Sequence, residues 1–475
     1  MLANFFSDQY WIARLIFQKS LALLYIVAFL VALNQFKALL GENGLLPVPR
    51  FLTYVKFSQA PSIFHFYYSD KFFMAITWIG LAVSIFLFFG FADKFSFLLN
   101  AFFWFIPWLI YLSIVNVGQT FYSFGWESLL LEIGFLSIFL GSNKSLVPII
   151  IIFLLRLILF KLEFGAGLIK IRGDECWRNL TCLNYHHETQ PMPNPLSWYF
   201  HNLPSSVHKL EVLGNHFVQL IVPWGLFLPQ PFSSIAATMI VGTQFWLVLS
   251  GNFSWLNWSA IILSFSAFSN SYLKRIFPFI EVPTSLTICS WQQNISIVIS
   301  ILILVLSYKP ILNLFSKQQK MNASFDSLHL VNTYGAFGSV TKQRYEIIIE
   351  GSLDKEINAN TKWLEYEFKG KPGDLAKMPA QYAPYHLRLD WLMWFASFGF
   401  RQQQHWFMPL IEKLLQNDRE TLKLLRTNPF DGQAPVYIRA RGYIYEFTNY
   451  QERKNTGNYW KRKLIGEYLE AVKLR

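Results

Sequence analysis

Residues able to do chemistry are concentrated in one short polar segment, residues 164–204, which follows a long apolar run. The segment holds acids, bases and cations in close succession: Lys170, Arg172, Asp174, Glu175, Arg178, His186, His187 and Glu188. Ionisable groups at a membrane boundary are costly unless they are paired or solvated, so such residues are candidates for function. Pro191, Pro193 and Pro195 then impose an extended course that excludes helix.

Lys170 is the first candidate for catalysis. It lies at the mouth of an apolar helix, where loss of solvent favours the neutral amine and makes it a usable base. His186, His187 and His216 are the histidines that could complete such a site. The pattern is consistent with a membrane enzyme whose base is Lys170.

A simpler interpretation of the same residues needs no catalysis. Lys170 and Arg172 would extend their charges to lipid headgroups while Asp174 and Glu175 pair with them. Lysine and arginine at the ends of membrane helices routinely behave in this way. We therefore favour the structural interpretation of these four residues.

The cysteines offer three kinds of chemistry. Cys176 and Cys182 are close enough in sequence to form a small disulfide loop or to remain buried thiols. Their spacing differs from the CxxC of thioredoxin-like redox pairs, which argues against a redox role. A zinc site that adds His186 or His187 is conceivable from ligand type, but the spacing matches no strong metal template. We expect a structural pair, no metal site and no cofactor.

The elements that position these residues must be largely membrane helices. Of 475 residues, 53% are hydrophobic and only 15% are charged, whereas a soluble domain has roughly 25% charged residues. A membrane span needs about 20 mainly apolar residues. Candidate spans, some of them short, cover residues 15–36, 72–91, 97–115, 129–140, 146–164, 217–228, 235–249, 255–268 and 295–308. We predict about eight spans.

Charged residues fall within or beside two of these apolar stretches: Glu127 and Glu132 in the first, and Arg156, Lys161 and Glu163 in the next. A charge facing lipid would cost several kcal/mol, so we expect pairing inside the helical bundle, for example Glu132 with Arg156. A path for protons or substrate is the functional alternative.

The last third of the chain has a different character. Strand-forming residue types predict a strand at 345–350, and alternating residues predict strands at 364–368, 436–441 and 443–447, with Gly442 marking a hairpin between the last two. Helical patterns cover residues 387–398, 406–415 and 420–425. The predicted fold is thus a polytopic α-helical membrane domain, residues 1–316, followed by a small α+β soluble domain, residues 317–475.

Within that soluble domain, Trp391 and Trp394 share a helix face beside Asp390. Packing in the core is the default interpretation, and contact with a client protein is the alternative. His386 and His405 have no evident partner in the sequence.

Several function classes are excluded or disfavoured. The net charge of +12 suggests contacts with anionic lipid rather than nucleic acid, because no basic cluster with interleaved aromatic residues is present. No GxSxG, Walker or zincin motif occurs, so the protein is not expected to be a lipase or an ATPase.

Longer motifs carry a resemblance to a known family. They are GWESLLLEIGFLSIFLG, GAGLIKIRGDECWRNLTC, YHHETQPMPNPLSWYFHNLP, EVLGNHFVQLIVPWGLFL, SGNFSWLNW, APYHLRLDWLMWFAS, LRTNPF and GNYWKRKLIGEY. Together they resemble the lipase maturation factor family over most of the chain. The resemblance implies a membrane protein that helps secreted lipases, or other exported clients, to reach an active state, and thus a chaperone for protein folding rather than an enzyme. It also implies residence in the endoplasmic reticulum membrane in a eukaryote, or in the inner membrane of a bacterium.

Candidate residues for binding the client or for shaping the site lie in the quoted motifs. They are Arg172, Asp174, Cys176, Trp177, Cys182, Gln190, Pro191, Asp390 and Trp391. Two alternative functions remain open. One is a membrane enzyme, because the Gly-containing helix with Lys170 and then Trp177 faintly resembles vitamin-K-dependent carboxylases, in which a membrane-embedded lysine acts as a base. The other is a thiol-redox factor that uses Cys176 and Cys182.

Overall fold

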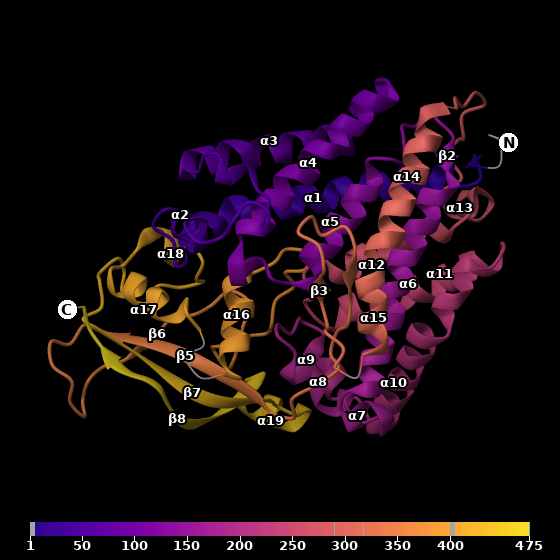
Figure 1. Cartoon of the computed structure of the whole chain (residues 1–475). Coiled ribbons are helices and arrows are strands. Elements are labelled where there is room, and N and C mark those ends of the chain that lie inside the picture. The colour runs from indigo at the N-terminus through magenta and orange to yellow at the C-terminus, as the bar shows by residue number, and fades with distance from the viewer. Residues whose placement is uncertain (1–4, 289, 317, 400–403, 475) are drawn as a thin grey trace.

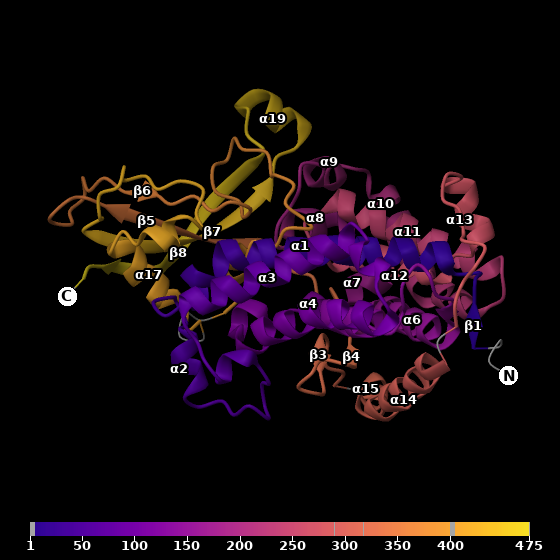
Figure 2. The ribbon, with the colours of Figure 1, turned by 90° about the horizontal axis from the view of Figure 1, so that it is seen from above.

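The structure is a computed structural model that describes residues 5–288, 290–316, 318–399 and 404–474. Cys289 lies outside these ranges. Helices dominate the first two thirds of the chain, and a four-stranded sheet with four short helices follows in the described part of the last third (Figure 1). The sheet and α17 lie at the end of the molecule opposite the N-terminus (Figure 2).

The helices up to α15 are α1 (Trp11–Leu40), α2 (Val48–Leu52), α3 (Asp70–Phe88), α4 (Phe97–Val117), α5 (Gly125–Ser137), α6 (Ile149–Arg172), α7 (Glu175–Arg178), α8 (Leu183–Thr189), α9 (Ser197–His201), α10 (Ser205–Leu220), α11 (Phe232–Ser250), α12 (Leu256–Ser264), α13 (Asn270–Ile276), α14 (Ser290–Leu306) and α15 (Tyr308–Phe315). Short strands β1 (Phe6–Ser7) and β2 (Val147–Pro148) pair with each other, as do β3 (Ala323–Ser324) and β4 (Asn332–Thr333).

Within the described ranges, five helical stretches are long and apolar enough to cross a membrane: Trp11–Leu40, Asp70–Phe88, Phe97–Val117, Phe232–Ser250 and Trp291–Phe315. Each coincides with a predicted span. The protein is therefore a polytopic helical membrane protein, but the predicted number of about eight spans is not confirmed.

The remaining predicted spans differ from these five in length or charge. Helix α5 has 13 residues and α12 has 9, whereas a span needs about 20. The predicted span at 217–228 divides between the end of α10 and a 3-10 helix, Val222–Phe227. Helix α6 is long enough, with 24 residues, but it carries several charged side chains, which must be satisfied inside the protein.

Close contacts between the first helices depend on small residues. Helix α1 packs against α3, and α3 packs against α4. A Cβ on Gly80 of α3 would lie 2.5 Å from the ring of Phe29 on α1. A Cβ on Gly134 of α5 would lie within 2.9 Å of the Tyr25 ring carbon that carries the hydroxyl. Any larger residue at either glycine would push the helices apart, and interiors packed this tightly tolerate little added volume.

The C-terminal sheet is antiparallel, with the strand order β6-β5-β7-β8. Its strands are β5 (Arg344–Ser352), β6 (Leu364–Glu365), β7 (Tyr437–Phe447) and β8 (Trp460–Val472), and the helices of this region are α16 (Arg388–Ala396), α17 (Phe407–Leu415), α18 (Arg419–Leu422) and α19 (Tyr450–Thr456). Helix α16 packs on β5, and α17 packs on β7.

The predicted hairpin at Gly442 is wrong. Strand β7 continues through Gly442, which pairs with Ile347 on β5 and with Gly466 on β8. The register between β7 and β8 shifts beside Gly442. A glycine inside a strand often marks such a bulge rather than a turn. The hairpin instead joins β7 to β8, with α19 in the connection.

Candidate functional site

The polar segment 164–204 lies between the membrane helices and the C-terminal sheet. Arg344, the first residue of β5, is completely buried and donates hydrogen bonds to the backbone carbonyls of Glu188 (2.8 Å), Pro191 (3.0 Å) and Gln190. Its guanidinium also pairs with Glu346 at 2.7 Å. One arginine therefore holds the start of the proline-rich stretch, because that stretch has no helical partners for its carbonyls.

Glu188 adds a second link to the sheet. Its carboxylate accepts a hydrogen bond of 2.9 Å from the amide of Phe447, the last residue of β7. Burial raises the pKa of Glu188 to about 7. His201 on α9 lies 3.6 Å from the same carboxylate, and burial lowers the pKa of His201 to about 4. This pair therefore titrates inside the junction between the two regions.

Gln190 joins the segment to the membrane helices. Its side-chain amide donates hydrogen bonds to the carbonyl of Ser250 (2.8 Å) at the end of α11 and to the hydroxyl of Ser197 (3.0 Å). Gly251 is required here, because a Cβ on it would lie 1.9 Å from the Gln190 oxygen. Gln190 and Pro191, both predicted as candidates, are thus buried or bonded parts of the junction.

Lys170 lies in a cavity of about 310 Å³ between α6, α10 and α11. It is only 5% exposed, and its ammonium donates to Gln219 (2.8 Å) and Asn215 (3.3 Å). It also lies 5.0 Å from the centre of the Trp177 ring. The preferred interpretation, in which Lys170 reaches lipid headgroups and pairs with the acids that follow, is therefore wrong for this residue. A cation held by amides inside an apolar cavity is a candidate to bind or polarise a ligand.

Arg172 and Asp174, by contrast, have structural partners. Arg172 is exposed and donates to the carbonyl of Leu314 (2.7 Å) and to Gln319 (2.9 Å). Asp174 accepts a hydrogen bond of 2.7 Å from the amide of Val340. Arg172 thus binds the end of α6 to α15 and to Gln319 after it, and Asp174 binds it to Val340 further along the chain.

Cys176 and Cys182 are joined by a disulfide. They pack with Trp177 and Val212 in a small apolar cluster. The Trp177 indole donates a hydrogen bond of 2.7 Å to the carbonyl of Phe337. The disulfide thus closes the loop that begins at the end of the Lys170 helix and presents Trp177 to the cavity.

The three predicted histidines lie near this cavity with different roles. His186 and His187 line it directly, and burial lowers the pKa of His186 to about 3. Burial also lowers the pKa of His187 well below its ordinary value. His216 contacts the carbonyl of Trp177 at 3.1 Å. The structure therefore brings Lys170 and these histidines to one region, as the catalytic hypothesis required.

The predicted pairing of Glu132 with Arg156 is wrong. Glu132 pairs with Lys161 and accepts hydrogen bonds from Tyr334 and Asn332. Arg156 instead donates to the carbonyls of Ser266 (3.0 Å) and Leu226 (3.2 Å). Both charges point into the protein, as expected, but rotation of α6 against α5 selects Lys161 as the partner. The carbonyls that Arg156 binds lie at 3-10 turns, where helical bonding leaves them available.

Glu127 contacts both the C-terminal region and α4. Arg388 donates a hydrogen bond of 2.7 Å to its carboxylate, and Tyr111 donates a second. His386, which has no evident partner in the sequence, lies 3.6 Å from Glu127 and accepts a hydrogen bond from the Trp126 indole at 3.3 Å. The partners of His386 are thus far from it in the sequence and meet it only in the folded protein.

Asp390 and Trp391 are structural. Asp390 accepts hydrogen bonds from the amides of Gly370 (2.6 Å) and Lys371 (3.2 Å), and burial raises its pKa to about 6. Trp391 packs its ring 4.8 Å from that of Trp126. The default expectation of core packing describes both residues, because neither side chain is more than 3% exposed.

Two residues that sequence reasoning missed complete a group able to hold a metal ion. His208 and Glu211 on α10 lie beside His187. Together these three side chains form a group of possible metal ligands among the described residues. The spacing of three residues between His208 and Glu211, which places both on one helix face, was the signal available in the sequence.

Comparison with known proteins gives a consistent result. Residues 12–275 match the model of the lipase maturation factor transmembrane domain, and residues 330–470 match that of the lipase maturation factor C-terminal domain. No solved structure matches the chain.

Individual relatives cover almost the whole chain. Lipase maturation factor 1 of Mus musculus is 40% identical over 99% of this chain and 89% of its own length. The Homo sapiens protein of the same name is 40% identical over 99% of this chain and 90% of its own length. Lipase maturation factor 2 of Xenopus laevis is 26% identical over 97% of this chain and 82% of its own length. The chain is therefore a member of the lipase maturation factor family.

Proposed function

We propose that this protein assists the folding and assembly of secreted lipases, or of other exported clients, at a membrane. The observation that carries the proposal is the similarity to lipase maturation factor 1, which extends through both the membrane helices and the C-terminal sheet. In the absence of a nucleotide-binding motif in the sequence, such assistance would draw on binding energy alone.

The C-terminal sheet supplies a surface for a partly folded client. Strand β8 is the terminal strand of the sheet (Figure 1). Leu464 and Ile465 in this strand are 49% and 53% exposed. An extended client segment can add to such an edge through main-chain hydrogen bonds, with apolar side chains supplying further contact. The client in this proposal is a lipase with an unpaired strand.

We also propose a division of the chain into two domains and a location in the membrane. Residues 1–316 form the membrane domain, and residues 317–475 form the domain outside the bilayer. The shorter helices and α6 would raise the number of crossing or re-entrant segments to about eight. The membrane would be that of the endoplasmic reticulum in a eukaryote or the inner membrane in a bacterium, with bound lipid as a further partner.

Co-expression with a secreted lipase tests the proposal. The full-length protein is expected to raise the lipase activity per amount of lipase secreted. Ile465→Lys adds a charge to the edge of β8 and is expected to remove most of that gain, because edge charges block strand addition. Leu474→Lys places the same charge at a residue that is also exposed, at 47%, but lies beyond the strand, and it should keep the gain. Equal gains from both variants would refute docking on β8, and no gain from the wild-type protein would refute the function.

An enzyme that uses Lys170 is the second candidate, because the buried ammonium lies in a cavity with His186 and His187. Substitution separates it from a thiol-redox factor. If Lys170→Ala leaves lipase maturation intact while Cys176→Ser abolishes it, the enzyme hypothesis fails. The redox hypothesis has less support, because Cys182 is completely buried and Cys176 is 9% exposed, which keeps a client thiol away.

A further inference from the structure

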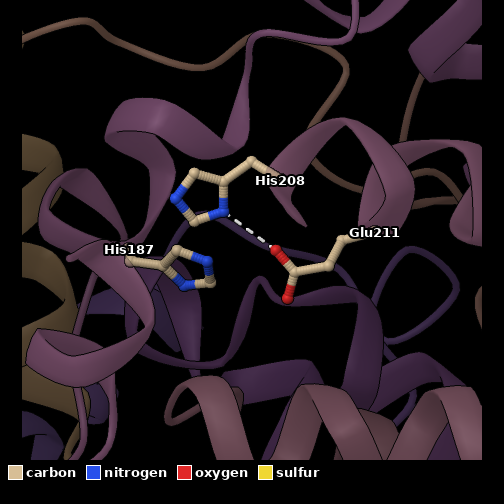
Figure 3. A group of neighbouring side chains, drawn as sticks. All are labelled: His187, His208 and Glu211. Carbon is tan, nitrogen blue, oxygen red and sulfur yellow. Dashed lines mark hydrogen bonds and ion pairs between the residues drawn. The ribbon is translucent and has the colours of Figure 1, made fainter. Parts of the chain in front are cut away.

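A second group of side chains lies at the edge of the cavity. His187 is on α8, and His208 and Glu211 are on one face of α10. Figure 3 shows the three side chains directed toward a common point. One ligand atom from each lies within 4.8 Å of those of the other two. The closest contact joins Nδ1 of His208 and a carboxylate oxygen of Glu211 at 2.9 Å.

The histidines of this group have unused hydrogen-bonding capacity. His187 is 2% exposed and His208 is 1% exposed. In the part of the chain that the structure describes, both ring nitrogens of His187 lack a hydrogen-bond partner. Nε2 of His208 also lacks one. Leaving a buried polar atom unpaired costs about 1–3 kcal/mol, so such atoms need an explanation. A metal ion bound through one ring nitrogen of His187 would explain one of them. The nitrogen that His208 directs toward the same point is Nδ1, the atom that faces Glu211, so the ion would replace the His208–Glu211 hydrogen bond.

The carboxylate is held in place from the other side. The indole of Trp246 on α11 donates a hydrogen bond of 3.1 Å to the second oxygen of Glu211. Metal sites usually contain such outer partners, which orient a ligand and fix the atom that faces the ion. Glu211 therefore presents one oxygen to His208 and the other to Trp246.

We propose that His187, His208 and Glu211 bind a zinc ion. Two imidazoles and one carboxylate form the donor set of zinc sites that keep a fourth position open. His187 and Glu211 also line the cavity that holds Lys170, so the fourth position would face that cavity and hold water. The thiols that could otherwise attract zinc are engaged in the disulfide of Cys176 and Cys182. The proposal is independent of the maturation function.

Zinc content of the intact protein tests the site. The full chain, purified in detergent, is treated with a chelator, incubated with Zn²⁺ and assayed by mass spectrometry of the metal. We expect one tightly bound zinc ion per chain. Glu211→Gln and His208→Gln should each weaken zinc binding roughly 100-fold or more, since loss of even an outer partner costs 10- to 100-fold. Trp246→Phe should weaken it by roughly 10- to 100-fold.

Controls distinguish this site from adventitious binding and from misfolding. His65→Gln removes a histidine in the 3-10 helix Ile63–His65, which precedes α3, and should leave zinc binding unchanged. Glu211→Gln keeps an oxygen that can accept the Trp246 hydrogen bond, so its unfolding temperature without metal should match that of the wild type. With Co²⁺ as the probe, visible absorption bands of a nitrogen and oxygen site are expected.

Three results would overturn the proposal. One is absence of zinc above the background after incubation. Another is equal zinc retention by wild type, Glu211→Gln and His208→Gln. The third is a thiolate-to-cobalt charge-transfer band, which would place the metal on cysteine instead.

Discussion

Arg388 and Glu127 form a completely buried ion pair of 2.7 Å between the C-terminal region and the membrane helices. They are 261 residues apart in the sequence. The guanidinium also lies 3.4 Å from the centre of the Tyr122 ring, and Tyr111 donates a hydrogen bond to the carboxylate. Either charge would be buried without an ionic partner if the other were absent, so this pair holds the start of α16 against α5.

Arg388→Gln should therefore destabilise the protein strongly. Breaking a buried pair by removing one partner costs about 3–5 kcal/mol, so the thermal unfolding midpoint in detergent should fall markedly. Lys37 and Glu420 make a matched control, because they also join the two regions but are partly exposed and 3.9 Å apart. Glu420→Gln should cost about 1 kcal/mol or less. Equal shifts for both variants would contradict the role given to Arg388.

Two lysines of α6 should respond differently to replacement by methionine. Lys161 pairs with buried Glu132, so Lys161→Met should cost about 3–5 kcal/mol. Lys170 donates hydrogen bonds to the amides of Gln219 and Asn215, and its ammonium lies 5.0 Å from the centre of the Trp177 ring. It makes no hydrogen bond to a carboxylate among the described residues. Its buried charge is not needed for packing, so Lys170→Met should leave the unfolding midpoint unchanged or raise it. A large loss of stability in Lys170→Met would show that the residue is structural.

The contribution of Glu188 to stability should fall as the pH rises. Its folded pKa of about 7 exceeds the ordinary value of 4.5, so the folded protein binds an extra proton between these values. The full effect corresponds to roughly 3 kcal/mol at most. The groups facing Glu188 are the Phe447 amide, Glu446, Arg344, Lys461 and His201. The free energy of unfolding of Glu188→Gln, relative to that of the wild type, should therefore rise between pH 5 and pH 8, roughly the range set by the two pKa values.

His201 acts in the opposite direction and must be separated from this effect. Its pKa is lowered from 6.5 to about 4 by burial, so the unfolded chain takes up a proton first and stability is lost as the pH falls below 6.5. Comparing wild type with Glu188→Gln at each pH largely cancels the His201 contribution. Glu467→Gln, at an exposed residue of β8, is the control. The difference in unfolding free energy between this variant and the wild type should not change with pH. A constant difference for Glu188→Gln as well would contradict the prediction.

The disulfide of Cys176 and Cys182 should be visible by thiol labelling. In the unfolded protein, a maleimide should modify these cysteines only after reduction, which mass spectrometry of the peptide detects. Because the closed loop is short, with a sequence separation of 6, the bond should contribute only about 2 kcal/mol by restricting the unfolded chain. The double variant Cys176→Ser and Cys182→Ser should therefore still fold. Labelling of both cysteines without reduction would show that they are free thiols.

Local patterns in the sequence predicted much of the architecture. The five helices long and apolar enough to cross a membrane follow from continuous apolar runs. Strand β5 follows from the strand-forming residues at 345–350, and the alternation at 436–441 and 443–447 predicted the two halves of β7. Hydropathy and alternation are properties of neighbouring residues, so they can be read without knowing the fold. The spans predicted at α5 and α12 are not confirmed, because these apolar helices are shorter than a membrane span.

The site was only partly predictable. The motif at 164–204 identified the family and the segment that contains Lys170, Cys176, His187 and Gln190. Nothing local indicated that His187 would meet His208 and Glu211, which lie on a later helix.

The sequence by itself determined that this is a membrane protein of the lipase maturation factor family, because composition and long motifs are independent of packing. Only the tertiary structure decided which charges meet: Glu127 with Arg388, and Glu132 with Lys161 rather than Arg156. The physical reason is that a buried ion pair depends on the rotation and crossing of two helices. Those follow from the packing of many side chains at once, so no single spacing in the sequence encodes them.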